Sequence, residues 1–270
     1  MSVVICAYNE ARFIGGLLAS LKRQSLVPGE VIVVDDGSID STAEIARAHG
    51  AKVLRSTHVG PAAGRNLGVD TASGEVVIFA DGDMTCGPDY VRDLSEPILA
   101  GRAVGTFTAE LYVGEPANRW SRAYCDIRRL GYPRMLPPDF PATWENFRAI
   151  GRVAFQEVGG YDDVGYGEDM TLAPKLGVMA IRVEGAACWH HNPDSPKEIF
   201  ENGRWIGRGH DIKRVARPWR DNSPLKSLIR SLADVRGGSA WSTILARQCY
   251  SAGVLTGLIG RRLGIAGHAK

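Results

Sequence analysis

Acidic residues follow three short apolar segments of the sequence. The segments are residues 2–7, 31–34 and 76–80, each rich in β-branched residues. The acids that come directly after them are Glu10, Asp35, Asp36, Asp81 and Asp83. Carboxylates that gather in one place repel one another unless a cation or a hydrogen-bonding ligand offsets their charge. Oxygen ligands of this kind suit Mg²⁺ or Mn²⁺, and such an ion neutralises a phosphate leaving group. The residue types and their spacing therefore predict chemistry on a substrate that carries a diphosphate.

The segments that carry these acids alternate with helical patterns over the first hundred residues. Strands are expected at residues 2–7, 31–34, 52–54 and 76–80, and helices at residues 14–21, 42–49, 61–72 and 88–99. This order predicts an α/β fold with a doubly wound, mostly parallel sheet, whose strands bring their carboxyl ends to one edge. Further on, helices are expected at 118–129, 152–158 and 168–176, strands at 104–113 and 180–183, and helices with loops from residue 196.

The balance of charge changes along the chain. Residues 1–196 carry 18 Lys+Arg and 25 Asp+Glu, whereas residues 197–270 carry 14 and 5. We therefore expect a catalytic domain over residues 1–195 and a basic, helical extension over residues 196–270. The net charge of the whole chain is only +2, which does not favour a nucleic-acid-binding protein.

The cysteines and the first residues bear on the compartment. The five cysteines are odd in number and widely spaced, with no C-x-x-C, which favours a reducing compartment over a disulfide framework. Residues 1–7 lack a basic region and a cleavage site, so we expect a buried strand there and not a signal peptide. The sequence contains no run of about 18 apolar residues, so no membrane span is expected. We expect a cytoplasmic protein.

Five short motifs, taken together over residues 1–195, resemble those of family-2 glycosyltransferases, which have the GT-A fold. The motifs are AYNE at 7–10, VDDGS at 34–38 with Asp40 and Thr42, GRNLG at 64–68, DGD at 81–83 and GED at 167–169. The resemblance implies transfer of a sugar, with inversion, from a nucleoside-diphosphate sugar to a hydroxyl of a sugar or lipid-linked acceptor. A UDP-sugar is the default donor, with GDP- and dTDP-sugars left open. It further implies Mg²⁺ or Mn²⁺ as cofactor and a place in cell-envelope polysaccharide synthesis.

The resemblance assigns roles to particular residues. The residues that it places against the nucleotide-sugar are Ala7, Tyr8, Glu10, Asp35, Asp36, Arg65 and Asp81. Asp83 is expected to ligate the metal directly, Asp81 to touch the ribose or the metal's hydration shell, and His190 to supply a further ligand. Asp169 is expected to be the base that deprotonates the acceptor hydroxyl, with Glu168 as a supporting acid or acceptor contact.

Arg204, followed by Trp205, is similar to the Arg-Trp of processive polysaccharide synthases. Those enzymes have Gln three residues before the Arg, where this chain has Glu201, and they also have flanking membrane spans. We therefore do not expect a processive polymerase. Arg204 is expected to contact the diphosphate or an anionic acceptor.

Two other functions stay open for the catalytic domain. One is a module that binds a nucleotide-sugar without turnover, and the other is a nucleotidyltransferase on a related fold. The first is disfavoured by the full acid set. The second is disfavoured because AYNE stands where a Gly-rich loop is expected.

The basic extension also has two interpretations. Leu225, Leu228, Ile229 and Leu232 form a helical apolar stripe with basic residues between them, and residues 248–260 carry no charge. Thirteen residues rise only about 20 Å as a helix, which is too short to span a bilayer. The extension either lies on the anionic inner face of a membrane or packs on the catalytic domain or at a homodimer interface.

Overall fold

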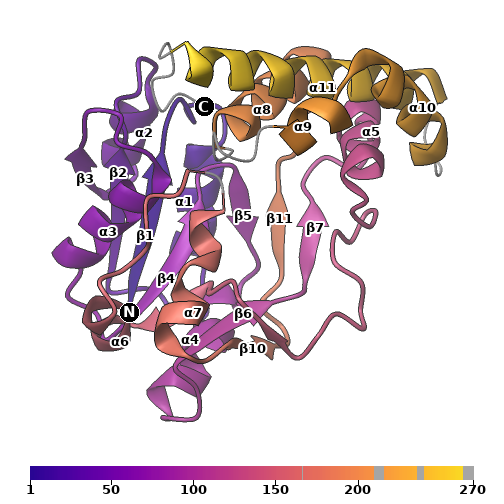
Figure 1. The fold of residues 1–270 in the computed structure, drawn as a ribbon. Helices are drawn as coiled ribbons and strands as arrows, with labels where there is room; N and C mark the ends of the chain where they lie inside the picture. The colour runs from indigo at the N-terminus through magenta and orange to yellow at the C-terminus, as the bar shows by residue number, and fades with distance from the viewer. Residues whose placement is uncertain (166, 210–215, 236–239, 264–270) are drawn as a thin grey trace. The chain divides into compact units, whose positions relative to one another are not determined.

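The computed structural model describes residues 1–165, 167–209, 216–235 and 240–263 (Figure 1). The chain divides into two compact units. Unit 1 comprises residues 1–112 and 136–190, and unit 2 comprises residues 113–135 and the described residues from 191 onward. Residues 113–135 thus group with the C-terminal helices. The division at residue 195 expected from the charge pattern stays a prediction.

Unit 1 is built on an eight-stranded sheet in the order β3-β2-β1-β4-β9-β6-β10-β8. The strands are β1 (Ser2–Ala7), β2 (Glu30–Asp35), β3 (Lys52–Arg55), β4 (Val76–Asp81), β6 (Gly105–Thr108), β8 (Thr143–Trp144), β9 (Ala149–Gly151) and β10 (Ala180–Val183). The strands β3, β2, β1 and β4 run parallel to one another and lie side by side in Figure 1. The predicted α/β fold with a mainly parallel sheet is confirmed.

Helices cover both faces of this sheet. They are α1 (Ile14–Lys22), α2 (Thr42–Ala48), α3 (Pro61–Thr71), α4 (Tyr90–Leu99), α6 (Arg152–Glu157) and α7 (Leu172–Leu176). Val3 and Ile5 of β1 pack with side chains of α1, α2 and α4, whereas Val4 between them packs with side chains of α3, α6 and α7. Successive strand residues point to opposite faces, so a strand with helices on both sides must be apolar throughout. This explains the continuous β-branched runs.

The short strand β9 was not predicted from the sequence. It lies between β4 and β6 and is antiparallel to both. A strand of three residues shows no measurable period, and its partners lie more than forty residues away along the chain. It matters because it brings the residues just before it to the edge of the sheet where β4 ends.

A second, smaller sheet contains β5 (Met84–Cys86), β7 (Leu111–Val113) and β11 (Cys188–His190). β5 and β11 are antiparallel, with His190 opposite Met84. This pairing places the histidine next to the acid that precedes β5.

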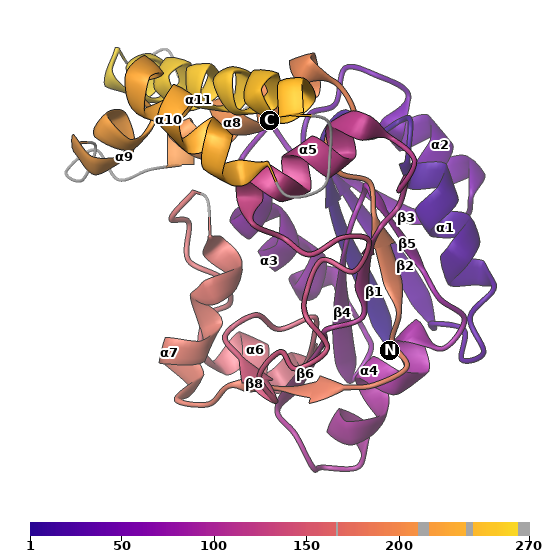
Figure 2. The same ribbon diagram turned by 90° about the vertical axis from the view of Figure 1, so that its right-hand side faces the viewer.

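Unit 2 is helical. Its helices are α5 (Arg119–Arg128), α8 (Pro196–Gly209), α9 (Ala216–Asp221), α10 (Pro224–Asp234) and α11 (Ala240–Arg262). Helices α8 and α11 run alongside each other (Figure 2) and approach closely through glycines. A Cβ added to Gly207 would lie 2.2 Å from the carbonyl oxygen of Val254, and one on Gly257 would lie 2.1 Å from that of Arg204.

No described helix is long and apolar enough to cross a membrane.

Candidate functional site

The carboxyl ends of β1, β2 and β4 carry the predicted acids to one edge of the sheet. In the parallel register Ala7 of β1 lies opposite Asp35 of β2, and Cys6 lies opposite Asp81 of β4. The sequence prediction that these residues meet at one sheet edge agrees with this register. Their roles toward a nucleotide-sugar stay predictions.

The loops that follow β1 and β2 are tied together by hydrogen bonds. The Asn9 amide donates to Ser38 Oγ at 2.9 Å, and the Ile39 amide donates back to Asn9 Oδ1 at 3.0 Å. The Glu10 amide donates to Thr42 Oγ1 at 2.8 Å. Asn9 has φ 56°, a left-handed conformation that asparagine tolerates better than most residues. These bonds fix the backbone around Tyr8 and Glu10 before any ligand arrives.

Asp36 is almost fully buried and holds the loop that leads into α3. Its carboxylate accepts the amides of Val59 and Gly60 at 2.8 and 2.9 Å, and it also accepts the Ser56 hydroxyl. Three donors leave this carboxylate little capacity for a nucleotide base. The same loop places His58 against Tyr8, with ring centroids 4.2 Å apart. This aromatic pair was not predicted, because no local pattern links His58 to the end of β1.

Asp35 is buried beside Asp36. Its Oδ1 accepts the Ser38 amide at 3.0 Å, and its Oδ2 lies 3.4 Å from Arg55 Nε. That Oδ2 is buried and has no hydrogen-bond partner among the described residues. Asp35 is thus held at this edge by the Ser38 amide and by its ion pair with Arg55.

Two arginines form ion pairs with the carboxylate of Asp81. Arg65 Nη2 of α3 lies 3.0 Å from Oδ1, and Arg148 Nη1 lies 2.8 Å from Oδ2. Burial alone would raise the pKa of Asp81, but Arg148 and Arg65 outweigh it and hold this pKa well below its usual range. Arg65 reaches this point because Gly64 lets α3 lie close to β1: a Cβ there would meet Cys6 Sγ at 2.4 Å.

Arg65 also joins the sheet edge to the second predicted pair of acids. Its Nη1 forms an ion pair with Glu168, which is buried at the start of the 3₁₀ helix η1 (Glu168–Met170). Burial raises the pKa of Glu168 above its usual value, partly offset by Arg65. The next residue, Asp169, accepts a hydrogen bond from the buried amide of Asn146. A chain of polar contacts thus runs from Asp81 through Arg65 to Glu168.

The residues that could hold a divalent cation are Asp83 and His190. Asp83 Oδ1 lies 3.4 Å from His190 Nε2, and His190 Nδ1 is buried without a hydrogen-bond partner in the described part of the chain. One carboxylate and one imidazole fit Mg²⁺ or Mn²⁺ that takes its other ligands from water and phosphates. No cluster of three or more His, Cys, Asp or Glu side chains among the described residues could hold a metal ion. Both oxygens of Asp81 are already engaged by arginine.

The remaining predicted residue, Arg204, belongs to unit 2. It lies on α8 and forms an ion pair with Glu201 at 2.5 Å. Its predicted contact with the diphosphate or an anionic acceptor stays a prediction.

Sequence reasoning missed Asn146 and Arg148. They flank Phe147 immediately before β9, and the Arg148 amide donates to the Thr106 carbonyl at 2.9 Å. The only signal in the sequence is a polar, aromatic, polar order before a short apolar run, which occurs in many surface loops. The antiparallel insertion of β9 brings these side chains to Asp81 and Asp169.

Comparisons with known proteins agree with this arrangement. The validoxylamine A glucosyltransferase of Streptomyces hygroscopicus subsp. jinggangensis (strain 5008) is 29% identical over 225 residues, covering 67% of this chain and 52% of that protein. The chain therefore spans about half the length of this relative, and 29% of two other curated relatives.

Solved structures show the same fold. S. aureus TarS 1-349 in complex with UDP-GlcNAc has TM-score 0.56 at 17% identity, covering 97% of this chain and 91% of that one. The mannosyltransferase PcManGT from Pyrobaculum calidifontis, in complex with GDP-Man and Mn²⁺, has TM-score 0.57 at 18% identity, covering 98% and 87%.

The sequence profile described as "Glycosyl transferase family 2" matches residues 2–159, which is more than half of the chain. The protein belongs to glycosyl transferase family 2.

Proposed function

We propose that the acids at the carboxyl ends of β1, β2 and β4, which we call the acidic edge of unit 1, form a site of sugar transfer. This edge transfers a sugar from a nucleoside-diphosphate sugar, with a UDP-sugar as the default donor, to an acceptor hydroxyl with inversion. One observation carries this proposal. Arg65 pairs with Asp81 at the end of β4 and with Glu168 at the start of η1. The predicted base, Asp169, is thereby held next to the edge where the donor is expected to lie.

Asp169 acts in this proposal as the general base. It takes the proton of the acceptor hydroxyl while that oxygen attacks the anomeric carbon and the bond to the diphosphate breaks. Asn146 donates to Oδ2 of Asp169 and so orients the carboxylate, and in this proposal the other oxygen takes the proton. A neutral donor orients the carboxylate without pairing it to a cation, which would lower its basicity.

Asp83 and His190 are the residues that would hold Mg²⁺ or Mn²⁺ in this proposal. When bound, such an ion offsets the negative charge that develops on the leaving diphosphate. In this proposal Tyr8 and the carboxylate of Asp35 contact the nucleotide. Asp36 supports the same site by holding the loop that carries His58.

The acceptor and the location of the protein are further parts of the proposal. We propose that the acceptor is a sugar or a lipid-linked hydroxyl and that transfer takes place at the cytoplasmic face of the membrane. The surplus of basic residues after residue 196 supports this, because anionic lipids attract such segments.

The test combines binding and turnover. Titration calorimetry measures UDP and GDP binding with and without Mn²⁺, and release of nucleoside diphosphate is followed with UDP-glucose, UDP-GlcNAc and GDP-mannose. We expect metal-dependent UDP binding and release that Asp83→Asn abolishes. The matched control Asp70→Asn, an exposed acid on α3, should change neither. Binding without any turnover across donors and acceptors would support a binding module instead, and no binding of either nucleotide would overturn the proposal.

A further inference from the structure

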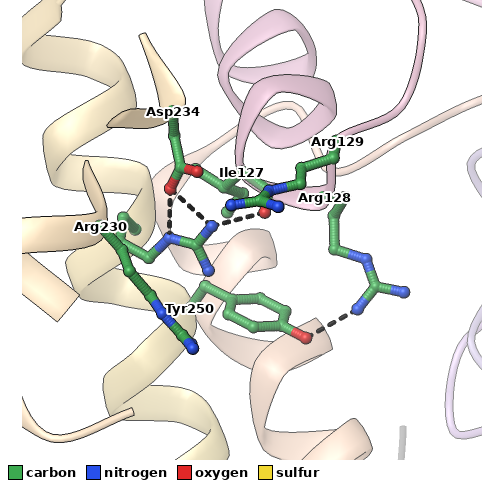
Figure 3. Close-up of a pocket in the computed structure, with 7 residues that line it drawn as sticks. Ile127, Arg128, Arg129, Arg230, Asp234 and Tyr250 are labelled. Atoms are coloured by element: carbon green, nitrogen blue, oxygen red, sulfur yellow. Dashed lines mark hydrogen bonds and ion pairs between the residues drawn. The ribbon is translucent and has the colours of Figure 1, made fainter. Parts of the chain in front are cut away.

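Unit 2 contains a cavity of about 310 Å³ whose walls are rich in arginine. We call it the arginine cavity, and its lining residues are Ile127, Arg128, Arg129, Arg230, Asp234, Arg247 and Tyr250 (Figure 3). They come from the end of α5 and from α10 and α11. None of them belongs to the acidic edge of unit 1.

Charge in the arginine cavity is not balanced by its own residues. The lining contains four guanidinium groups and one carboxylate, that of Asp234. Arg247 uses this carboxylate, with Nε and Nη2 at 2.8 and 2.6 Å from Oδ2, and also donates to the Ile127 carbonyl. Arg128 donates to the Tyr250 hydroxyl at 2.7 Å (Figure 3). The structure thus holds several cations close together where an anion would offset their repulsion.

Asp221, an acid outside the cavity lining, is shared by several cations. Arg230 Nη2 lies 3.5 Å from Asp221 Oδ1, and the same oxygen lies 2.7 Å from Lys226 Nζ and 3.7 Å from Arg220 Nε. The carboxylate of Asp221 therefore lies close to three cationic side chains. The local surplus of positive charge extends from the cavity along α9 and α10.

Helix α10, which forms one wall of the cavity, is inverted relative to an ordinary surface helix. Its polar residues Ser227, Ser231 and Asp234 are buried, with 0–2% of their surface exposed. Its apolar residues are exposed, by 72% for Leu225, 49% for Leu228, 61% for Ile229 and 68% for Leu232. The buried serines are satisfied: Ser227 Oγ lies 3.0 Å from Ser251 Oγ, and Ser231 donates to the Leu228 carbonyl. An apolar stripe of this size facing outward indicates an apolar medium or partner.

We propose that the arginine cavity binds the phosphate group of an anionic phospholipid while the apolar stripe of α10 enters the bilayer beside it. Guanidinium groups are planar donors that match phosphate oxygens in pairs, and they are less strongly hydrated than ammonium groups. Arg230 follows Ile229 on α10 and points about 100° away from it, while Asp234, which also lines the cavity, is buried on the side opposite the leucines. A lipid at the edge of the stripe therefore reaches the cavity from the Arg230 side, with its phosphate there and its acyl chains beside the stripe.

A bilayer fits these features better than a second copy of the chain. In a symmetric dimer the same patch faces itself, so the cations that flank the stripe would oppose each other. The headgroup phosphates of an anionic bilayer carry negative charge, which is opposite to that of the cations beside the stripe. The proposal goes beyond sugar transfer and does not depend on the identity of the donor.

The experiment measures co-sedimentation of the full chain with two kinds of vesicle. One contains only phosphatidylcholine, and the other contains phosphatidylcholine with phosphatidylglycerol. We expect partition into the phosphatidylglycerol vesicles alone. Arg129→Asn and Arg230→Gln should each weaken it about tenfold, whereas loss of a basic residue outside the cavity, Arg262→Gln, should weaken it by no more than about fivefold. Asparagine suits position 129, where φ is 59°.

Further variants and ligands show whether the apolar stripe, the phosphate group or both cause the protein to bind vesicles. Leu228→Gln combined with Leu232→Gln should abolish partition, because both side chains are exposed and lose their apolar contact with lipid. Inorganic phosphate alone, tested by thermal shift, should give less protection than vesicles of equal phosphate content. Equal binding to both vesicles, or an equal effect of Arg129→Asn and Arg262→Gln, would overturn the cavity as a site for an anionic phospholipid. A concentration-dependent dimer that the stripe variants abolish would replace the bilayer with a second copy.

Two controls keep this test separate from the proposed function. UDP binding by calorimetry should be unchanged in all four variants, and thermal unfolding should show that each is folded. If the protein binds no nucleotide yet partitions as expected, the lipid site stands while the sugar-transfer proposal fails.

Discussion

The charged side chains at the sheet edge of unit 1 and those around the arginine cavity of unit 2 are balanced in different ways. In unit 1, Asp81 and Glu168 face Arg65 and Arg148, two carboxylates against two guanidinium groups. In unit 2, the lining of the cavity contains four arginines and one carboxylate. A balanced network keeps its geometry without a ligand, so removing one member leaves a buried charge unpaired. Removing an exposed cation from the unbalanced cluster, such as Arg129, costs little stability but weakens the attraction for an anion.

The largest effect on stability is expected from Arg148→Met, which breaks the balance in unit 1. Methionine keeps much of the apolar stem but leaves Asp81 with one cation. We expect the free energy of unfolding in urea to fall by about 3 kcal/mol. The control Arg102→Met removes an exposed partner of Glu96 and should cost less than about 1 kcal/mol. Similar losses in the two variants would mean that the edge network does not stabilise unit 1.

The next largest effect concerns the close packing of helices α8 and α11 in unit 2. Gly257→Ala places a Cβ against the Arg204 carbonyl, so we expect a loss of about 2 kcal/mol. Gly260→Ala on the same helix α11 meets nothing within 4 Å. It should be neutral or stabilising by up to about 1 kcal/mol, since alanine favours helix. Urea unfolding decides, and equal effects at the two positions would refute close packing of α8 and α11.

A smaller effect is expected in the pH dependence of the free energy of unfolding, to which the paired acid Asp81 contributes. Its folded-state pKa is depressed, so it stays ionised where the unfolded chain begins to bind a proton, below pH of about 4. The stabilisation is therefore present above that pH and is lost as pH falls. Asp81→Asn should remove up to about 1.4 kcal/mol of pH dependence per pH unit in the acid range. Unfolding curves of the variant and the wild type that stay parallel from pH 3 to pH 7 would contradict this.

The smallest effect on stability is expected in unit 2 from Arg129→Asn. This exposed arginine adds to an existing surplus of positive charge, so its removal relieves repulsion. The free energy of unfolding should change by less than about 0.5 kcal/mol. A loss of stability comparable to that of Arg148→Met would show that the cavity arginines stabilise the fold. It would contradict the proposed difference in charge balance between the two units.

The sequence predicted the parts of the fold that rest on local pattern. β1, β2 and β4 are apolar runs because helices cover both of their faces, and the acids that follow them reach one edge through the parallel register. Arg148 and Asn146 could not be predicted in the same way. Their positions depend on the insertion of β9 between β4 and β6, a long-range pairing of three residues that leaves no periodic signal.

The apolar stripe of α10 shows the other limit of sequence reasoning. The helical spacing of its leucines was visible in the sequence, but spacing does not say which side of a helix is buried. Ser227 and Ser231 are buried because their hydroxyls find partners on α11 and within α10, which leaves the leucines outside. Only the packing of unit 2 reveals this inversion.

The substitution Asp169→Asn tests most directly the proposal that the acidic edge of unit 1 transfers a sugar with Asp169 as the base. Asparagine keeps the shape of the side chain but cannot accept the proton of the acceptor. The measurement pairs the turnover number with the donor dissociation constant from calorimetry. We predict that kcat falls by about 10²- to 10⁴-fold while donor affinity changes less than about threefold. Donor affinity that collapses together with turnover, or turnover that persists, would contradict the assignment of Asp169 as the base.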